Sequence, residues 1–387
     1  MNILFISPSV NPYNEKGYGS VQRTNLLLKA CSKVGKVDVI TFTNNAISNI
    51  EGVSTIYSKE LITKGIKYTR LQSICALIFP WYVYFSFPKN KEASKVVEQA
   101  ICAKEYDFIV IRYIPEAMKC GLLKFAEKLI IDVDDNPLDI AKFTAKTAIR
   151  LRKRVYHRLQ IFGLNITLCK LIKKIRFAFY ANPKQAIYKN SAYLPNIPFY
   201  EINDASVVKF AETKKSIFFI GNLCYGPNFS GIDHFITNIF PKIRKVVPEV
   251  TFNVGGACHE TDKLKWNAIP NVNVLGFVDD LLEEYRKSRV IVVPIYKGAG
   301  TNIKVLEGMQ MMRPIVTTEC GIRGFDDFFV EGKDFLLAHN DEEFVEYVVT
   351  LLQDEQLNQQ ISENAITILN NEFTQKKFYS IVSNVIR

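Results

Sequence analysis

Lys304 and Glu307 are the two side chains whose types and spacing most favour chemistry in this sequence. They lie three residues apart, so a helix would place them on one face. A predicted strand ends at Pro294, and Gly298 and Gly300 then permit close backbone approach before the helix. A cation beside a helix N-terminus suits a diphosphate, and a carboxylate one turn later can accept hydrogen bonds from the vicinal hydroxyls of a ribose. The alternative is a surface helix with an ordinary Lys/Glu pair.

Thr301 is the predicted cap of this helix, because a threonine hydroxyl can accept a hydrogen bond from the first helical amides. The amides of residues 301–303 would then form the anion site. Val305, Leu306 and Met309 are expected on the side that faces the core.

Five short apolar runs follow one another in the second half of the chain, and each ends on glycine or a polar turn. They lie at residues 216–221, 251–255, 272–275, 290–294 and 315–318. Strands that alternate with helical segments predict a parallel Rossmann-like sheet. The functional loops of such a sheet lie at the carboxyl ends of the strands.

The first half shows a similar series of apolar runs. They lie at residues 3–7, 37–42, 108–112 and 129–133, with a helical pattern at 21–33. A proline-containing turn at 194–198 and the polar stretch that follows indicate a boundary. We therefore predict an α/β protein with Rossmann-like domains at 1–205 and 206–370, and a helix at 371–387 that packs back toward the first domain.

Four motifs occur together. They are Gly298-x-Gly-Thr-Asn-x-Lys-Val-Leu-Glu307-Gly-Met, Phe218-Phe219-Ile220-Gly221-Asn222 with Pro227-Asn228, Gly276-Phe277-Val278, and Leu194-Pro195-Asn196. The combination resembles the group 1 glycosyltransferases, a retaining family whose longest pattern is G-x-G-T-x-x-K-x-L-E-A-M. The second motif resembles a subgroup that makes exopolysaccharides.

The resemblance implies the GT-B fold, in which two Rossmann-like domains with parallel sheets face a central cleft. It also implies transfer of a sugar from a nucleotide-sugar co-substrate to a saccharide or lipid-linked acceptor, without a metal or a tightly bound cofactor. Lys304, Asp134 and Asp135 are the candidate catalytic residues. The donor-binding candidates are Gly17, Gly19, Gly221, Asn222, Asn228, Gly276, Phe277, Val278, Gly298, Ala299, Gly300, Thr301, Asn302, Lys304 and Glu307.

Two positions depart from the family pattern. Ala299 stands where the family has a first glutamate, so a sugar contact there would have to come from the backbone amides of 298–302. Asn222 and Asn228 stand in a loop where several members carry Arg and Lys, which leaves Lys304 as the main candidate cation. The first departure keeps a second hypothesis open, a catalytically degenerate GT-B protein that binds sugar nucleotide or acts as a scaffold at the membrane.

The loop that holds Gly17 and Gly19 has part of a dinucleotide fingerprint, but Gln22 occupies the place of its third glycine. A nicotinamide-dependent dehydrogenase is therefore disfavoured. In the resembling family this loop closes over the donor phosphates and the acceptor. Arg23 is a candidate helper there.

Asp132, Asp134 and Asp135 end a predicted strand. Their D-x-D string is similar to the metal motif of the GT-A fold, where carboxylates hold Mn²⁺ and a diphosphate. We favour the GT-B interpretation because the donor signature is complete in the other half of the chain. One aspartate is expected to cap the next helix and another to approach the acceptor, with Arg23, Arg112 and Asp132 as acceptor candidates.

Positive charge is concentrated in the first half. Residues 1–212 carry 31 Lys and Arg against 17 Asp and Glu, whereas the remainder carries 18 and 22. The stretch between Asp139 and Glu201 has 13 basic and no acidic residues. Basic clusters at 150–158 and 170–176, mixed with apolar residues, predict peripheral contact of the 150–176 block with an anionic membrane. A solvated basic face is the alternative, and nucleic acid is disfavoured because no nucleic-acid-binding motif is recognisable.

The N-terminus has no basic region before its apolar run, and the eight cysteines are scattered. Such cysteine usage is typical of a reducing compartment. We therefore predict a cytoplasmic protein, with peripheral contact to the inner face of the plasma membrane. The resemblance to the exopolysaccharide subgroup implies a role in bacterial surface polysaccharide synthesis.

Overall fold

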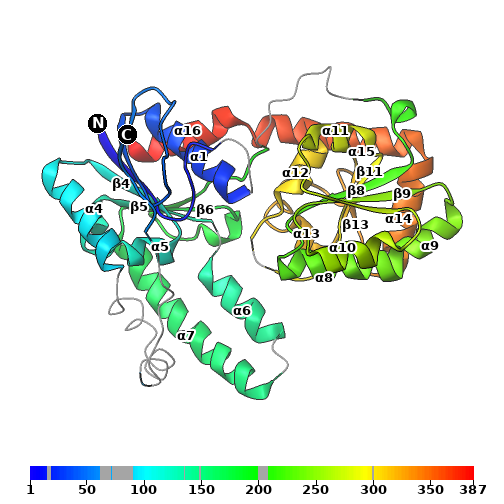
Figure 1. Ribbon diagram of the computed structural model, residues 1–387, viewed down its shortest axis with the longest axis horizontal. Coiled ribbons are helices and arrows are strands. Elements are labelled where there is room, and N and C mark those ends of the chain that lie inside the picture. The colour runs from blue at the N-terminus through cyan, green and yellow to red at the C-terminus, as the bar shows by residue number, and fades with distance from the viewer. Residues whose placement is uncertain are drawn as a thin grey trace. The chain divides into compact units, whose positions relative to one another are not determined.

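The computed structural model is shown in Figure 1, and it describes residues 1–14, 19–61, 71, 90–134, 136–147, 150–198, 208–298 and 300–387. The chain forms two compact units. Unit 1 comprises Met1–Asn196 and Gln375–Arg387, and unit 2 comprises Ile197–Thr374. The predicted boundary at residues 205 and 206 lies outside the described residues.

Unit 1 is built on a sheet of seven parallel strands in the order β3-β2-β1-β4-β5-β6-β7. The strands are β1 Asn2–Ser7, β2 Lys36–Thr41, β3 Val53–Ser58, β4 Phe108–Arg112, β5 Leu129–Asp134, β6 Phe177–Tyr180 and β7 Ser191–Tyr193. The central strands are buried on both faces, as parallel strands between helical layers must be. The strand order changes direction between β1 and β4.

Helices cover both faces of this sheet. They are α1 Gly19–Ser32, α4 Lys91–Ala103, α5 Ile114–Lys119, α6 Pro137–Thr147, α7 Leu151–Lys174 and α16 Gln375–Ile386, with a 3-10 helix, η1, at Leu122–Lys128. One hydrophobic core joins Leu4 and Ile111 in the sheet with Val97 of α4, Ala117 of α5 and Leu171 of α7. The C-terminal helix α16 packs beside α1, so the end of the chain belongs to the first unit.

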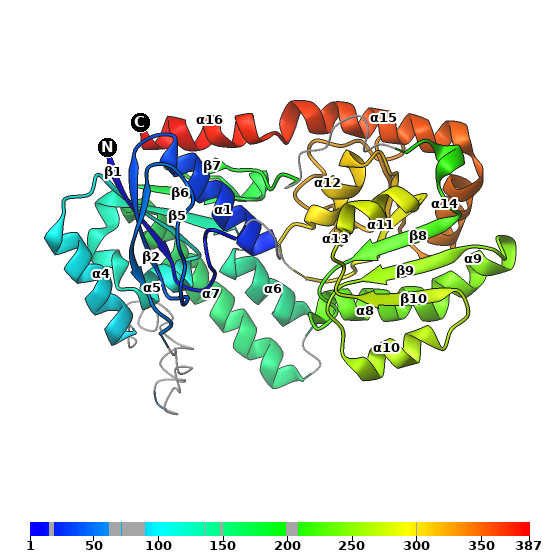
Figure 2. The same ribbon diagram turned by 45° about the horizontal axis from the view of Figure 1, so that its top comes forward.

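Unit 2 repeats the architecture with six parallel strands in the order β10-β9-β8-β11-β12-β13. The strands are β8 Ser216–Ile220, β9 Thr251–Gly255, β10 Val272–Gly276, β11 Val290–Val293, β12 Ile315–Thr317 and β13 Leu336–Leu337. Figure 2 shows β8, β9 and β10 side by side. The order changes direction between β8 and β11. Ligands of doubly wound sheets bind at such a switch point, beyond the carboxyl ends of the strands.

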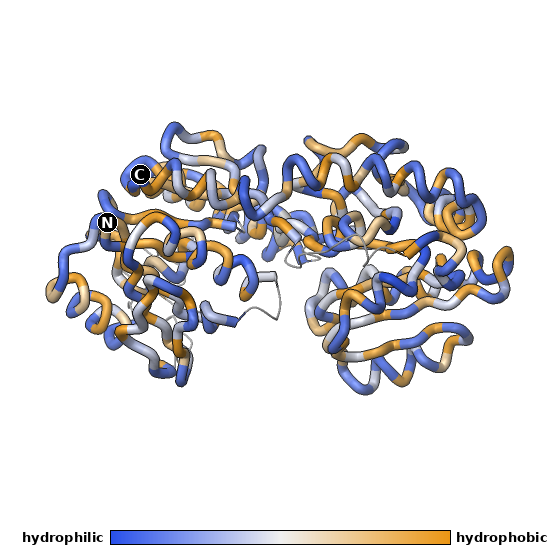
Figure 3. The backbone as a smooth tube through the Cα atoms, turned by 90° about the horizontal axis from the view of Figure 1, so that it is seen from above, coloured by the Kyte–Doolittle hydropathy of each residue, from blue (hydrophilic) through white to orange (hydrophobic). Residues whose placement is uncertain are grey.

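The helices of unit 2 are α8 Gly226–His234, α9 Phe240–Val246, α10 Glu260–Asn267, α11 Leu281–Lys287, α12 Ile303–Gln310, α13 Glu319–Ile322, α14 Asp341–Gln353 and α15 Glu355–Glu372. The covering helices alternate between hydrophobic and hydrophilic residues, as their single buried faces require (Figure 3). The α/β class and the two parallel sheets are confirmed.

Residues 226–246 form one continuous helical stretch, in which Phe235–Ile239 is π-helical. Phe177, directly after the basic cluster at 170–176, begins strand β6. Among the described residues, no helix has the length and hydropathy to cross a membrane.

Candidate functional site

Glycines close the ends of three neighbouring strands at the switch point of unit 2. The amide of Gly221 donates to the Gly255 carbonyl at 3.1 Å, and the amide of Gly256 donates to the Gly276 carbonyl at 2.6 Å. Gly256 has a φ of +122°, and a Cβ there would lie 1.9 Å from the carbonyl oxygen of Gly221. Only glycine allows this approach. The loops after β8, β9 and β10 are thereby held together.

Lys304 lies at this point, and it is buried although its side chain is a cation, with 7% of its surface exposed. Its Nζ donates to Oδ1 of Asn228 at 3.2 Å and lies 4.2 Å from the ring centroid of Phe219. It forms no ion pair with a carboxylate of the described residues. Burial lowers the pKa of Lys304 to about 7, although Glu307 offsets part of the effect. A buried cation without an anionic partner is costly, and an anion supplied by a ligand would compensate it.

Asn228 links Lys304 to the loop after β8. Its Nδ2 donates to the carbonyl of Asn222 at 2.9 Å, while its Oδ1 accepts from Lys304. The Asn222 side chain accepts from the amide of Cys224 and so shapes the turn. The structure therefore brings together Gly221, Asn222, Asn228 and Lys304, which come from two separate motifs.

Glu307 is buried one turn after Lys304, with 6% of its surface exposed. Tyr285 of α11, which the sequence analysis did not single out, donates its hydroxyl to Glu307 Oε2 at 2.9 Å. Burial raises the pKa of Glu307, while Tyr285 and Lys304 oppose that rise. The interpretation of α12 as a surface helix with an ordinary ion pair is wrong, because both side chains are buried and each has a different partner.

The cap of α12 differs from the prediction. Asn302, not Thr301, precedes the first helical residue, and its side chain donates to the carbonyls of Cys320 and Gly321 instead of capping the helix. No described residue accepts a hydrogen bond from the amides of Ile303 and Lys304. These donors remain available at the N-terminus of an eight-residue helix.

The loop after β11 approaches α8 through glycine. Gly298 and Gly300 have φ values of +132° and +84°. A Cβ on Gly298 would lie 3.4 Å from Pro227, and the Gly298 carbonyl accepts from Nη1 of Arg323 at 2.8 Å. Arg323, which lies between Gly321 and Gly324, was not predicted as a site residue.

The turn after β10 exposes an aromatic side chain. Gly276 has a φ of +76°, and 76% of the surface of Phe277 is exposed. Val278 lies against Gly255, since a Cβ added to Gly255 would be 2.9 Å from Val278 Cγ2. The predicted turn therefore lies next to the loop after β9.

Arg23 and Asp132 form a buried bidentate pair in unit 1. Nε and Nη2 of Arg23 donate to the two carboxylate oxygens of Asp132, both at 2.8 Å. Its remaining N–H groups donate to the carbonyls of Leu194 and Pro195 and to the side chain of Asn196. All five N–H groups have partners, so Arg23 and Asp132 are closed inside unit 1.

Arg112 extends this network toward the surface. It donates to Asp132 Oδ2 at 2.8 Å and to Asp134, which is less buried than Asp132. Tyr113 follows β4 and Asp134 is the last residue of the adjacent strand β5, and their φ values of +66° and +50° are uncommon for residues other than glycine. Burial alone would raise the pKa of Asp132. The attraction of Arg23 and Arg112 for its carboxylate outweighs that effect and holds the pKa below its ordinary value. Asp132 is therefore already neutralised by arginine, an arrangement unlike an open metal site.

Three predicted residues, Gly17, Asp135 and Ala299, lie outside the described residues. Gly19 is the first residue of α1.

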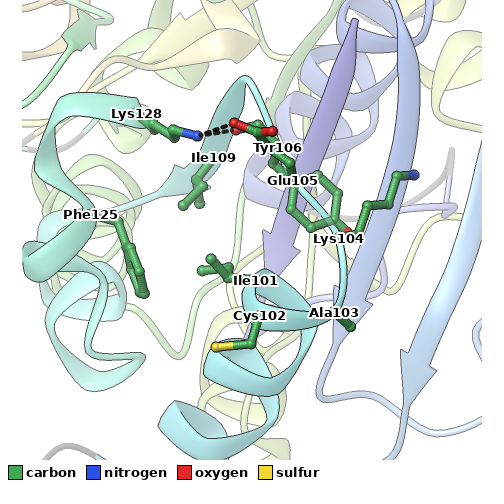
Figure 4. Close-up of a pocket in the computed structure, with 9 residues that line it drawn as sticks. All are labelled: Ile101, Cys102, Ala103, Lys104, Glu105, Tyr106, Ile109, Phe125 and Lys128. Carbon is green, nitrogen blue, oxygen red and sulfur yellow. Dashed lines mark hydrogen bonds and ion pairs between the residues drawn. The ribbon is translucent and has the colours of Figure 1, made fainter.

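A pocket with a volume of about 370 Å³ lies elsewhere in unit 1 (Figure 4). It is lined by Ile101, Cys102 and Ala103 at the end of α4, and by Tyr106 and Phe125. It opens beside the start of β4, at the amino end of the strand, whereas the predicted residues Arg112 and Asp134 lie at carboxyl ends. The pocket is therefore separate from the candidate sites.

Comparison with known families matches residues 214–354 to the glycosyl transferases of group 1. Unit 2 carries a group 1 glycosyltransferase domain. The matched range contains the donor-binding candidates from Gly221 to Glu307. Within the group 1 domain, the buried pair Lys304 and Glu307 lies at the switch point of the sheet.

A curated relative of this chain is an uncharacterised 44.6 kDa protein in the cps region of Klebsiella pneumoniae. It is 21% identical over 182 residues, which cover 45% of this chain. The alignment spans 46% of the length of that relative.

Solved glycosyltransferases show the same fold over the whole chain. Sucrose-phosphate synthase from Thermosynechococcus elongatus has a TM-score of 0.70 at 12% identity and covers 99% of this chain and 97% of its own. Anabaena HepE, solved with UDP and glucose, has a TM-score of 0.65 at 15% identity. The match covers 99% of this chain and 98% of the HepE chain. WaaG, a glycosyltransferase involved in lipopolysaccharide biosynthesis, has a TM-score of 0.62 at 13% identity. The match covers 100% of this chain and 99% of the WaaG chain. The chain therefore has the GT-B fold.

Proposed function

We propose that this protein is a retaining glycosyltransferase that moves a sugar from a UDP- or GDP-sugar to a saccharide or lipid-linked saccharide. The observation that carries the proposal is Lys304, a buried cation without a carboxylate partner at the switch point of a group 1 glycosyltransferase domain. The cps-region relative supports a role in bacterial surface polysaccharide synthesis. The complex of HepE with UDP and glucose supports a UDP-sugar donor.

The donor diphosphate would bind between Lys304 and the free amides at the start of α12. The charge that grows on the departing diphosphate would be stabilised by Nζ and by those N–H groups. Glu307, oriented by Tyr285, would accept hydrogen bonds from the ribose hydroxyls. A phosphate oxygen of the leaving group would take the acceptor proton, so no separate general base is required.

The test is a thermal-shift screen against UDP-, GDP-, ADP- and CMP-sugars, because a ligand of the native state raises the melting temperature. We expect a shift with a UDP- or GDP-sugar that is lost in Glu307→Ala and reduced in Tyr285→Phe. Transfer or hydrolysis of the bound donor would then separate an enzyme from a degenerate binding scaffold. A screen without any shift would contradict the donor site.

Gly221→Ala should weaken donor binding about tenfold or more, because the added methyl group would clash within the site and cost about 1–3 kcal/mol of binding free energy. A Cβ at Gly221 would lie 2.8 Å from Asn228 Nδ2 and 2.9 Å from Lys304 Nζ. These are the ends of flexible side chains, so the fold should persist while the site changes. Calorimetric titration with the donor measures the effect. Gly226→Ala is the matched control, because nothing lies within 4 Å of its Cβ position, and equal affinities for the two variants would contradict the prediction.

Donor affinity should fall as the pH rises through about 7, the value to which burial lowers the pKa of Lys304. Below that pH Nζ is charged and attracts the diphosphate, and above it the free protein must first take up a proton. The fall is limited to about tenfold for each pH unit, since a single proton is involved. Titration of the nucleoside diphosphate between about pH 6 and pH 9 measures it. A Lys304→Met variant should lack this dependence, and the same profile in both proteins would exclude Lys304 as its source.

Asp134, Arg112 and Tyr113 are the proposed acceptor-side residues of unit 1, since Asp134 is the less buried carboxylate of the arginine network. We also propose a cytoplasmic location with peripheral membrane contact. Both proposals fit an acceptor that is carried on a lipid.

A further inference from the structure

The first half of α7 exposes a row of large apolar side chains on one helix face. Leu151, Val155, Leu159 and Phe162 follow one another at spacings of four, four and three residues, which places them on one side of the helix. The exposed fractions of Leu151 and Phe162 are 75% and 71%. We call these four residues the apolar row.

The apolar row is not a continuation of the unit 1 core. Leu164 lies two residues after Phe162, so their side chains point to roughly opposite sides of the helix, about 200° apart. Leu164, Leu168 and Leu171 are buried on that other side. In the second half of the predicted 150–176 block, the apolar residues therefore belong to the core, whereas Lys170, Lys173 and Lys174 are exposed. Figures 1 and 2 show α7 beside α6, and the pair extends away from the sheet of unit 1.

Positive charge borders the apolar row. Arg152 follows Leu151 and Arg158 precedes Leu159, so the two guanidinium groups lie on either side of the row. The 24 residues of α7 contain seven Lys and Arg and no acidic residue. Apolar side chains flanked by arginines, on a helix that carries no acidic residue, fit a surface of anionic head groups above acyl chains.

We propose that the first half of α7 lies on an anionic membrane surface, with the apolar row at the acyl boundary and Arg152 and Arg158 at the lipid phosphates. A symmetric contact with a second copy fits less well, because a two-fold interface would bring like arginines together. The inference rests on the proposed peripheral location. It does not depend on donor binding or on transfer.

Cosedimentation with vesicles tests this inference on the full chain. We expect binding to phosphatidylcholine vesicles that contain phosphatidylglycerol, weaker binding to phosphatidylcholine alone, and loss of binding with rising salt. Arg152→Gln and Arg158→Gln should each weaken binding about fivefold, as expected for one charge near such a surface. Leu159→Ser combined with Phe162→Ser should weaken it about tenfold or more, because both side chains would leave the acyl boundary.

Leu264→Ser and Lys245→Gln are matched controls, because Leu264 is also exposed and Lys245 is an exposed cation in unit 2. They should bind vesicles like the wild type. The proposal is overturned if the wild type does not bind anionic vesicles, or if the α7 variants bind them as well as the wild type does. It is also overturned if those variants only convert a dimer to a monomer in light scattering. Nucleotide thermal shifts of the same variants should be unchanged, so failure of the membrane site and failure of the donor site are distinguishable.

Discussion

Lys304→Ala should lower the turnover of sugar transfer about a hundredfold or more, the usual effect of removing one group that stabilises charge in a transition state. Lys304 is proposed to bind the donor diphosphate and to stabilise it further as its negative charge grows while the glycosidic bond breaks. The loss should therefore appear in kcat as well as in KM. Steady-state kinetics with the donor found in the thermal-shift screen measure it.

Lys304→Met separates charge from packing, because methionine keeps an unbranched chain of similar length beside Phe219. It should lose as much turnover as Lys304→Ala while its unfolding remains close to that of the wild type. Lys245→Ala, which removes an exposed cation of the same unit, should remain fully active. Turnover near the wild-type value in Lys304→Met would exclude leaving-group stabilisation by this residue.

The sheets could be predicted because their strands are short apolar runs that end on glycine or polar turns. β4 and β9 have the predicted bounds. β13 has two residues and β3 is only half-buried, so neither gives a continuous apolar run. β6 was not among the predicted strands, because it has only four residues and directly follows the basic cluster at 170–176.

The candidate donor-side residues stand out as a set because they lie in contiguous motifs, but the pairs that they form could not be predicted. Tyr285 is 22 residues before Glu307, and Asn228 is 76 residues before Lys304. No pattern in a single sequence specifies such pairs, because topology brings them together. The burial of Lys304 could not be predicted either, because an exposed ion pair on a helix has the same spacing as Lys304 and Glu307.

The acceptor candidates show the opposite case. Arg23, Arg112 and Asp132 were selected for their charge. The structure shows that the two arginines donate chiefly to Asp132, to Asp134 and to backbone carbonyls. Charged residues at strand ends therefore indicate where a network lies. They do not show which of its members face a ligand.

Arg23→Ala should destabilise unit 1 by about 3–5 kcal/mol, the usual cost of removing one partner of a buried ion pair. The substitution takes two charged hydrogen bonds from Asp132 and leaves the carbonyls of Leu194 and Pro195 without these donors. It also removes a guanidinium 5.9 Å from the ring centroid of Phe378 on α16. Arg23 thus joins α1 to the segments through which the chain leaves and re-enters unit 1. Hydrogen exchange of the β1 and β5 amides would measure the loss within unit 1.

Arg152→Ala is the matched control, because it removes an exposed arginine of the same unit and should change stability by less than about 0.5 kcal/mol. Equal exchange in the two variants would contradict the structural role of Arg23. The pH dependence gives a second measure. The pKa of Asp132 is lower in the folded than in the unfolded chain, so its contribution is complete above about pH 4 and is lost as the pH falls through the folded value. The stability difference between the wild type and Arg23→Ala should therefore persist at neutral pH and shrink in acid, whereas a packing defect alone would leave it unchanged.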